Sequence, residues 1–487
     1  MGGGGAGPGA QLQSRQKGLR AVRLGRETAA QLAASVARPG FDPAAQACGI
    51  VHFGIGAFHR AHQAAYTDAA MAAGDRDWRI IGVSLRSGDV AAQLNPQDGL
   101  YTLVERSSDA VAMRLIGSVA RVIVAPKAPD DVIAAIASPD THIVSFTVTE
   151  KGYVRRADGS LDTDNSALAS DLSGSVPRTI YGFIAAGLAM RKAAGLPGLT
   201  LLSCDNLADN GRQLRLLMRA FLEATNPVLA DWFDTHCRCP ATMIDRIVPA
   251  MTVEDRAWVA DQIGLEDDGA IITEPFTQWV IEDDFAGPRP RWEAVGAQLV
   301  ADVRPYEAAK LRMLNGAHSA LAYLGLDAGH EFVHQAVADP EIRPVIETIM
   351  REEAAATLDP ASGIDTVVYA GSLLERFANS ALQHRLMQIA MDGSQKIPQR
   401  WLEPLAVNQA AGRSCPATLQ ALAAWVRHVR GDVRSVDDPQ AQALAQLWQA
   451  HGANGIIEAL FGSQGLFAST WVASEADQVQ IKAALFP

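Results

Sequence analysis

Three side chains close together in the sequence have the types that hydride chemistry on an alcohol or a ketone requires. They are Lys310, Asn315 and His318, within the stretch Lys-Leu-Arg-Met-Leu-Asn-Gly-Ala-His. On an α-helix, at about 100° per residue, Asn315 would lie about 140° and His318 about 80° around the axis from Lys310. All three can therefore line one side of a pocket, as a proton carrier and two hydrogen-bonding groups. The same three residue types also occur on the surfaces of ordinary helices.

The neighbours of Lys310 favour a role as a base. Leu311, Met313 and Leu314 interleave with the three polar residues, and an apolar setting lowers a lysine pKa because it disfavours the ammonium form. Glu307 lies three residues before Lys310, close enough on a helix to exchange a proton with it through water. An ordinary pair on one helix face is the alternative interpretation of that spacing.

The length and charge of the chain limit what it can be. At 487 residues it exceeds one hydrophobic core, so two domains are expected. The formal net charge of −12 argues against a nucleic acid or an anionic membrane as the main partner. No apolar run is long enough to span a bilayer. Residues 1–18 are glycine-rich and lack the apolar core of a signal peptide, so we expect a flexible tail there.

The five cysteines are scattered and odd in number, which favours a reducing cytoplasm over a disulfide framework. His236, Cys237 and Cys239 lie close together, but no second ligand pair has a familiar metal-site spacing, so we expect no metal. With nucleic acid and membrane argued against by the charge and the apolar runs, the expected partner is a small molecule, bound by a monomer or a small homo-oligomer.

Short apolar runs alternate with helical patterns from about residue 49 to residue 274, which predicts a parallel sheet covered by helices. The predicted strands are 49–53, 78–84, 141–147 and 199–203, and the predicted helices include 59–73, 129–137 and 177–194. After about Val300 long Ala/Leu-rich helical segments dominate. We therefore predict an α/β fold, with a Rossmann-type dinucleotide-binding domain at 19–298 and a mostly α-helical domain at 299–487. Lys310 would then lie in the cleft between the domains.

A cofactor signal follows the first predicted strand. Gly54 and Gly56 form a Gly-x-Gly turn into a helix, where the first glycine permits the tight turn and the second lets backbone N–H groups approach a pyrophosphate. Phe58 and Arg60, at the start of that helix, are further candidate cofactor contacts. His59 occupies the place of the third glycine of the usual fingerprint, so an ordinary strand-to-helix turn remains an alternative.

Asp89 follows the strand predicted at 78–84 and is placed to accept hydrogen bonds from an adenosine ribose, which favours NAD. A solvated loop carboxylate is the alternative. NADP stays open at this point, because Arg86 could pair with a 2′-phosphate and Gly88 leaves space for one.

Two further polar residues follow predicted strands. Asn206 comes after the strand at 199–203, at the end of the sheet where such proteins place their chemistry. Its amide could join that of Asn315 to hold a substrate oxygen, although it could instead cap a helix. Asp245 stands beside Arg246, so the carboxylate either supports the structure in an ion pair or takes part in the chemistry.

Taken together, these motifs resemble the long-chain mannitol dehydrogenase family from about Ile50 to Phe486. The matching segments are Gly54–His62, Thr147–Tyr153, Ser203–Asn206, Glu274–Asp283, Lys310–His318 and Asp392–Lys396. The resemblance implies an NAD-dependent, metal-independent oxidoreductase of polyols or sugar acids. It also implies the site residues, with Lys310 as general base, Asn206 and Asn315 as oxyanion hole, His318 as substrate-orienting residue, Glu307 as gate of a proton path, and Asp245 and Lys396 as substrate contacts or supports.

One departure bears on the substrate. Mannitol-specific members tend to have an arginine where this chain has Gln388, and the segment around it looks more like the mannonate oxidoreductase branch. A uronate carries a carboxylate, which Arg385, Lys396 or Arg400 could bind. We therefore expect D-mannonate and D-fructuronate first, with D-mannitol and D-fructose as the alternative. A hydroxyacid dehydrogenase would explain only the Lys–Asn pair, and a non-catalytic dinucleotide sensor would retain a base and donors that it does not use.

Overall fold

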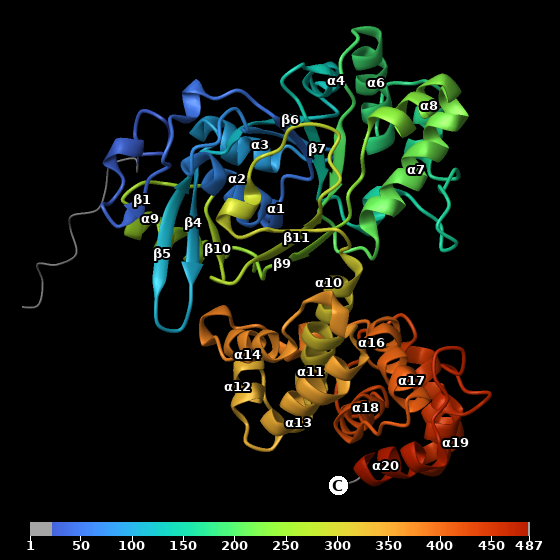
Figure 1. Cartoon of the computed structure of the whole chain (residues 1–487). Helices are drawn as coiled ribbons and strands as arrows, with labels where there is room; N and C mark the ends of the chain where they lie inside the picture. The colour runs from blue at the N-terminus through green and yellow to red at the C-terminus, as the bar shows by residue number, and fades with distance from the viewer. Residues whose placement is uncertain (1–21, 486–487) are drawn as a thin grey trace, which may run out of the picture.

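The protein divides into a half that contains the sheets and a half that is helical (Figure 1). The computed structural model describes residues 22–485, so the tail predicted at residues 1–18 lies outside the described residues. The part of the chain up to β12 is called the sheet half, and the part from α10 onward is called the helical half. The segment that joins them runs from β12 directly into α10.

A five-stranded parallel sheet forms the centre of the sheet half, in the order β6-β3-β2-β7-β8. Its strands are β2 (Ile50–Phe53), β3 (Ile80–Ser84), β6 (Val119–Val124), β7 (Ile143–Phe146) and β8 (Thr200–Ser203). β2, β7 and β8 are buried at every residue, as expected of strands covered on both faces. This order is that of dinucleotide-binding sheets, so the predicted fold class is confirmed.

Helices cover both faces of this sheet. Val51 and Phe53 of β2 pack into one core with α4, α6, α7 and α8, while Ile50 packs into another with α2 and α3, because successive strand residues face opposite sides. The helices of this half are α1 (Ala57–Ala61), α2 (Gln63–Ala72), α3 (Asp89–Leu94), α4 (Pro129–Ala137), α5 (Ser166–Leu172), α6 (Ile180–Ala193), α7 (Asn210–Thr225), α8 (Pro227–His236) and α9 (Val253–Ile263). The helix predicted at 59–73 is two helices, because the backbone breaks at His62.

Two smaller sheets complete the sheet half, in the orders β1-β5-β4-β10 and β12-β11-β9. Their strands are β1 (Val36–Ala37), β4 (Tyr101–Arg106), β5 (Val111–Ile116), β9 (Thr242–Asp245), β10 (Ile271–Thr273), β11 (Gln278–Glu282) and β12 (Gln298–Val300). Asp245 ends β9, and Glu274 directly follows β10. Both carboxylates thus lie at strand ends, near the helical half.

The helical half is built around α11, whose residues from Gly316 to Leu326 are all buried. It comprises α10 (Arg304–Ala309), α11 (Gly316–Asp327), α12 (Val333–Ala338), α13 (Ile342–Thr348), α14 (Thr366–Phe377), α15 (Leu386–Ile389), α16 (Gly393–Ile397), α17 (Glu403–Ala410), α18 (Pro416–His428), α19 (Ala441–Phe461) and α20 (Glu475–Leu485), with π-helical segments η6 (Lys310–Asn315), η7 (Ile349–Ala354) and η11 (Pro398–Leu402). No named strand follows Val300 in the described chain.

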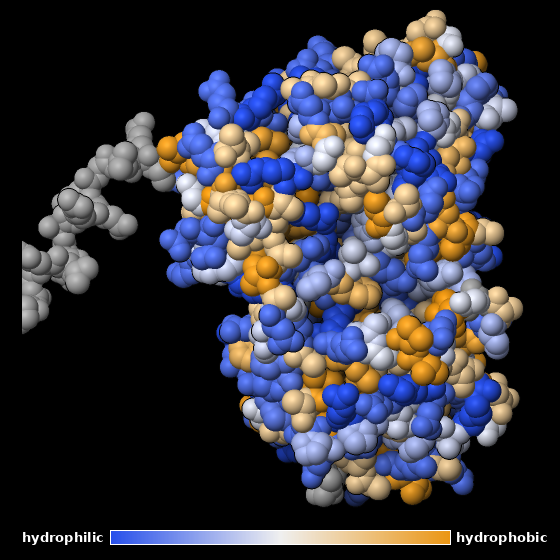
Figure 2. Space-filling model, turned by 60° about the vertical axis from the view of Figure 1, so that its left-hand side comes forward, coloured by the Kyte–Doolittle hydropathy of each residue, from blue (hydrophilic) through white to orange (hydrophobic). Residues whose placement is uncertain are grey.

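The surface is hollowed where the two halves meet, and both hydrophilic and hydrophobic residues border the hollow (Figure 2). Within residues 22–485, no helix is both long and apolar enough to cross a membrane.

Candidate active site

Two adjoining cavities lie where the halves meet. The first, called the glycine cavity, has a volume of about 590 Å³ and includes Gly54, Gly56 and Phe58 in its wall. The second, called the helical cavity, has a volume of about 420 Å³ and includes Asn315 and residues of α16 and η11. Residues that line both are Glu150, Asp205, Asn206, Ile244 and Lys310. Both volumes are in the range of small-molecule sites, so a ligand in one cavity can meet a ligand in the other at Lys310.

Lys310 is half-buried at this junction. Its Nζ donates to Asn206 Oδ1 at 2.9 Å and to the Ile244 carbonyl at 2.7 Å. Burial lowers the pKa of this lysine, and the nearby Asp245 carboxylate partly opposes the shift. A neutral amine that uses its two N–H groups in these bonds has its lone pair left for a third direction. The geometry therefore suits a base that accepts a proton in the cavity.

The turn that carries Lys310 and Asn315 is π-helical, which differs from the α-helix assumed from the sequence. Because a π-helix bonds residue i to residue i+5 and so has more residues per turn, residues five apart lie closer to one face than the about 140° of an α-helix. Asn315 consequently shares the wall of the helical cavity with Lys310. The π-turn aligns the two residues better than the predicted α-helix would.

His318 follows the π-turn on α11, and its predicted role as the substrate-orienting residue stays a prediction. It is buried on α11, with its ring 4.6 Å from that of Phe377 and 5.4 Å from that of His384, and it lines neither cavity. Its Nε2 has no hydrogen-bond partner, and burial lowers its pKa well below the usual value.

Asn206 follows β8 and is exposed to both cavities. Because its carbonyl oxygen accepts from Lys310, its amide nitrogen is the part left to donate to a ligand oxygen. The preceding residue, Asp205, is held by the backbone N–H groups of Val148 and Thr149 at 3.1 and 2.8 Å and by the hydroxyl of Tyr153 at 2.9 Å. These bonds fix the strand end that presents Asn206.

Glu307 lines the helical cavity and accepts a hydrogen bond from the Asp209 N–H at 3.1 Å. Burial raises the pKa of this carboxyl to about 7. A carboxyl with such a pKa can both take up and release a proton near neutral pH. This chemistry fits the predicted proton path from Lys310.

Two of the three predicted substrate cations, Lys396 and Arg400, line the helical cavity. Arg400 uses Nη1 to bond Ser319 Oγ at 2.8 Å and the Asn315 carbonyl at 3.3 Å, and burial lowers its pKa to about 10. Lys396 donates to the Met391 carbonyl at 2.6 Å and, at 3.4 Å, to that of Ile389. Both side chains can present further N–H groups to a ligand.

Arg385 and Gln388 are not brought to the site. Arg385 is 62% exposed and pairs with Glu331, and Gln388 is exposed outside both cavities. Although the Lys396 ammonium reaches the carbonyl of Ile389, the residue after Gln388, neither the Arg385 nor the Gln388 side chain lines the cavity that Lys396 lines.

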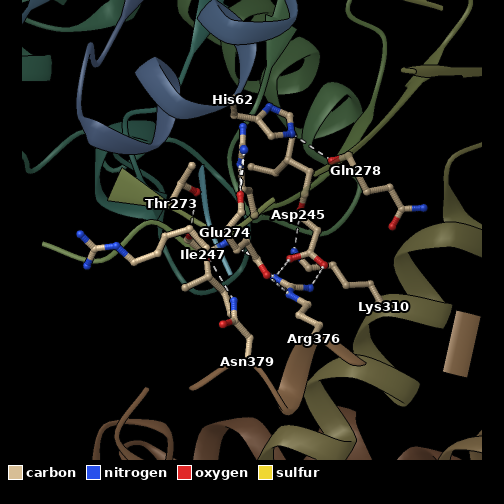
Figure 3. A network of polar contacts seen from close by, with 12 residues as sticks. His62, Asp245, Ile247, Thr273, Glu274, Gln278, Lys310, Arg376 and Asn379 are labelled. Carbon is tan, nitrogen blue, oxygen red and sulfur yellow. Dashed lines mark hydrogen bonds and ion pairs between the residues drawn. The ribbon is translucent and has the colours of Figure 1, made fainter. Parts of the chain in front are cut away.

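Asp245 is paired, but not with its sequence neighbour (Figure 3). Its carboxylate receives two hydrogen bonds, at 2.5 and 3.1 Å, from Arg376 of α14. The neighbouring Arg246 instead donates to Glu105 and to the Glu274 carbonyl. Sequence reasoning missed Arg376, because no motif marks an arginine that lies 131 residues from its partner.

The two glycines of the turn serve different needs. Gly54 has φ +93°, and a Cβ there would lie 2.1 Å from the Thr147 carbonyl oxygen, so the backbone itself requires glycine. A Cβ at Gly56 would meet nothing closer than the Gly54 oxygen at 3.9 Å. Gly56 is therefore free of protein contacts on the side of the glycine cavity, as a backbone that receives a pyrophosphate must be.

The other predicted cofactor contacts divide. Phe58 lines the glycine cavity. Arg60 does not, since it is buried and donates to the Gly269 carbonyl at 2.7 Å. Asp89 is the exposed first residue of α3 and lines neither cavity. His59, in the place of the third glycine, is buried with its ring stacked 3.4 Å from that of His52.

The five cysteines are free thiols. Within residues 22–485, no cluster of three or more His, Cys, Asp or Glu side chains has the arrangement of a metal site.

A Rossmann sheet whose glycine turn opens onto a cavity that reaches a half-buried lysine has the arrangement of a dehydrogenase that acts on CH–OH groups. The sequence matches the family model "Mannitol dehydrogenase Rossmann domain" over residues 48–294 and "Mannitol dehydrogenase C-terminal domain" over residues 302–476. The chain therefore belongs to the mannitol dehydrogenase family.

Relatives within the family differ in substrate. The chain is 41% identical to the D-mannonate oxidoreductase of Escherichia coli K12, over 89% of this chain and 91% of that protein. It is 40% identical to the mannitol 2-dehydrogenase of Pyrenophora tritici-repentis, over 85% of this chain and 75% of that protein. Its fold is similar to that of the Pseudomonas fluorescens mannitol 2-dehydrogenase ternary complex with NAD and D-mannitol, with a TM-score of 0.78 and 37% identity over 95% of each chain.

The role of Lys310 can be tested by its removal. Lys310→Ala should lower kcat for alcohol oxidation by at least about 10²-fold, as expected for loss of a general base. In the wild type, kcat/KM for oxidation should rise with pH up to a lysine pKa below the usual value, because only the neutral amine accepts a proton. Steady-state kinetics across pH would show both effects, and full turnover by the variant would contradict the assignment.

The two glycines form a matched pair. Gly54→Ala should lower the melting temperature because its Cβ collides with the Thr147 carbonyl. Gly56→Ala should leave the melting temperature near the wild-type value and weaken NAD binding, measured by calorimetry. If both variants bound NAD like the wild type, the glycine cavity would not be the cofactor site.

Proposed function

We propose that this protein is an NAD-dependent oxidoreductase that interconverts D-mannonate and D-fructuronate. The observation that carries the choice of substrate is that Arg400 and Lys396 line the same cavity as Lys310. A carboxylate at one end of a sugar acid would then contact the cations while a hydroxyl at its other end approaches the base. Identity to the E. coli D-mannonate oxidoreductase over most of both chains supports the same choice.

The division of labour follows the two cavities. NAD, held along the Gly54–Gly56 turn beside Phe58, supplies the hydride acceptor for oxidation. Lys310 takes the hydroxyl proton, and the amides of Asn206 and Asn315 donate to the oxygen as negative charge develops on it. Glu307 passes the proton towards solvent. We assign cofactor binding to residues 19–298, and substrate binding to residues 299–487.

The second candidate is oxidation of D-mannitol to D-fructose. Four carboxylates, Glu150, Asp205, Glu307 and Asp392, line the helical cavity, and carboxylates are good acceptors for the hydroxyl groups of a neutral polyol. The likeness to the mannitol 2-dehydrogenase complex favours the same substrate. The two candidates share the cofactor, the base and the oxyanion donors, and they differ only in what Arg400 and Lys396 contact.

The shared oxyanion donors predict a pattern of losses. Asn206→Ala and Asn315→Ala should each lower kcat by roughly 10²–10³-fold, since each removes one donor to the developing charge. The double variant should lose less than the product of the single losses, because both amides serve one oxygen. Fully multiplicative losses in kcat would argue against a common oxygen, and normal kcat with a lower melting temperature would indicate a structural role only.

Substrate choice can be tested directly. A charge-assisted hydrogen bond to the carboxylate contributes about 1.5–3 kcal/mol, so kcat/KM for mannonate should exceed that for mannitol by at least about tenfold. Arg400→Gln or Lys396→Gln should lower this ratio, with little change in any mannitol activity. Arg385→Gln is the matched control, since it removes a cation from the same segment outside the cavity and should leave the ratio unchanged. A wild-type preference for mannitol would overturn the hexonate proposal and favour the polyol.

A further inference from the structure

Arg376 joins the two halves of the protein at Asp245, close to Lys310 (Figure 3). It projects from α14 of the helical half, and its side chain is 3% exposed, between carboxylates of the sheet half that are 8% and 1% exposed. Those carboxylates belong to Asp245, bonded at 2.5 and 3.1 Å, and Glu274, bonded by Nε at 2.7 Å. The guanidinium also lies 4.5 Å over the ring of Phe276. Such a forked arrangement holds both partners in one geometry.

The backbone beside Asp245 includes a carbonyl that accepts a hydrogen bond from Lys310. The carbonyl of Ile244, the residue before Asp245, accepts from Lys310 at 2.7 Å. On the other side, the N–H of Ile247 donates to the Glu274 carboxylate at 2.6 Å. The segment 244–247 is thus held by the same carboxylates that Arg376 binds. A shift of either carboxylate would move the carbonyl that orients the lysine.

The side chains of Arg376, Asp245 and Glu274 also determine the charge near Lys310. Two buried carboxylates share one guanidinium, and removal of that guanidinium would leave both unpaired. The charged groups that act on Lys310 are Asp245 and Glu307, which favour its ammonium form, and Arg376 and Arg400, which disfavour it. His62 also lies near Lys310, but burial lowers its pKa to about 3, so its ring is neutral near neutral pH. Further charged groups in the cavities that Lys310 lines are Glu150, Asp205, Arg246, Asp392 and Lys396.

We propose that Arg376 is a positioning residue of the active site, which pins Asp245 and Glu274 across the junction of the two halves and so fixes the Ile244 carbonyl against Lys310. This inference rests on the proposed role of Lys310 as the base. In this arrangement the helical half supplies the base, Lys310, and also, through Arg376 of α14, the cation that balances the Asp245 carboxylate.

Two substitutions separate the geometric from the electrostatic effect. Arg376→Lys keeps the charge and loses the fork, so kcat for oxidation should fall about tenfold or more, because small misplacements of reacting groups are costly. Arg376→Gln also loses the charge. Its kcat/KM profile for oxidation should therefore shift to higher pH by at least about half a unit, since the unbalanced carboxylates favour the ammonium form of Lys310. KM for NAD should change little in either variant.

Asn379→Ala is the matched control. Asn379 lies just beyond α14 and also bridges the halves, by a 3.3 Å bond to the Arg106 carbonyl, but among the described residues it forms no hydrogen bond with Asp245 or Glu274. We expect wild-type kcat and pH profile from this variant, even if its melting temperature falls.

The outcomes distinguish the inference from the proposed function. Arg376 variants with the wild-type kcat and pH profile, and only a lower melting temperature, would overturn the positioning role and leave Lys310 as the base. Full activity of Lys310→Ala would instead overturn the proposed function. Should Arg376→Gln fail to fold, Arg376→Lys decides, since a wild-type kcat in that variant contradicts the inference.

Discussion

The site depends on the removal of one lysine from water. Lys310 can act as a base near neutral pH only if its ammonium form is disfavoured, and burial supplies that effect. Neither half of the protein can provide this burial alone. The helical half carries the lysine on η6, while the strand ends of the sheet half bring Asn206 and the Ile244 carbonyl to its nitrogen. Contacts that fix one half against the other, such as that of Arg376 with Asp245, therefore bear on the chemistry.

Much of the fold could be predicted because its signals are local. Four of the five strands of the parallel sheet are short apolar runs, and the structure places these four within two residues of the prediction at each end, whereas β6 was not predicted. Gly54 has a positive φ, and a glycine directly after an apolar strand is readily recognised in the sequence. The domain boundary near residue 298 stays a prediction, although the last strand ends at Val300.

The parts of the site that were missed or misplaced are those that depend on direction or on distant partners. Arg60 follows the glycine turn in sequence, but its position on the helix turns it into the protein, towards the Gly269 carbonyl. The π-turn at Lys310–Asn315 depends on which carbonyl accepts a hydrogen bond from each backbone N–H, and the residue types do not predict this acceptor. Arg376 finds its partner through tertiary packing alone. Composition and spacing predict which polar residues lie near a strand end, but only the structure shows which of these residues contact one another.

The wall of the helical cavity repels an anion less than the number of its carboxylates suggests. Asp205 has both oxygens occupied by donors from the protein, and Glu307, with a pKa of about 7, is partly neutral near neutral pH. Glu150 and Asp392 are the other two carboxylates in the wall of the cavity. Opposite them, Arg400 uses only Nη1 in bonds to described residues, so the other edge of its guanidinium is left for a ligand. Because a bidentate pair needs two N–H groups on one edge, Arg400 retains the geometry that a sugar-acid carboxylate requires, while the two free carboxylates suit its hydroxyl groups.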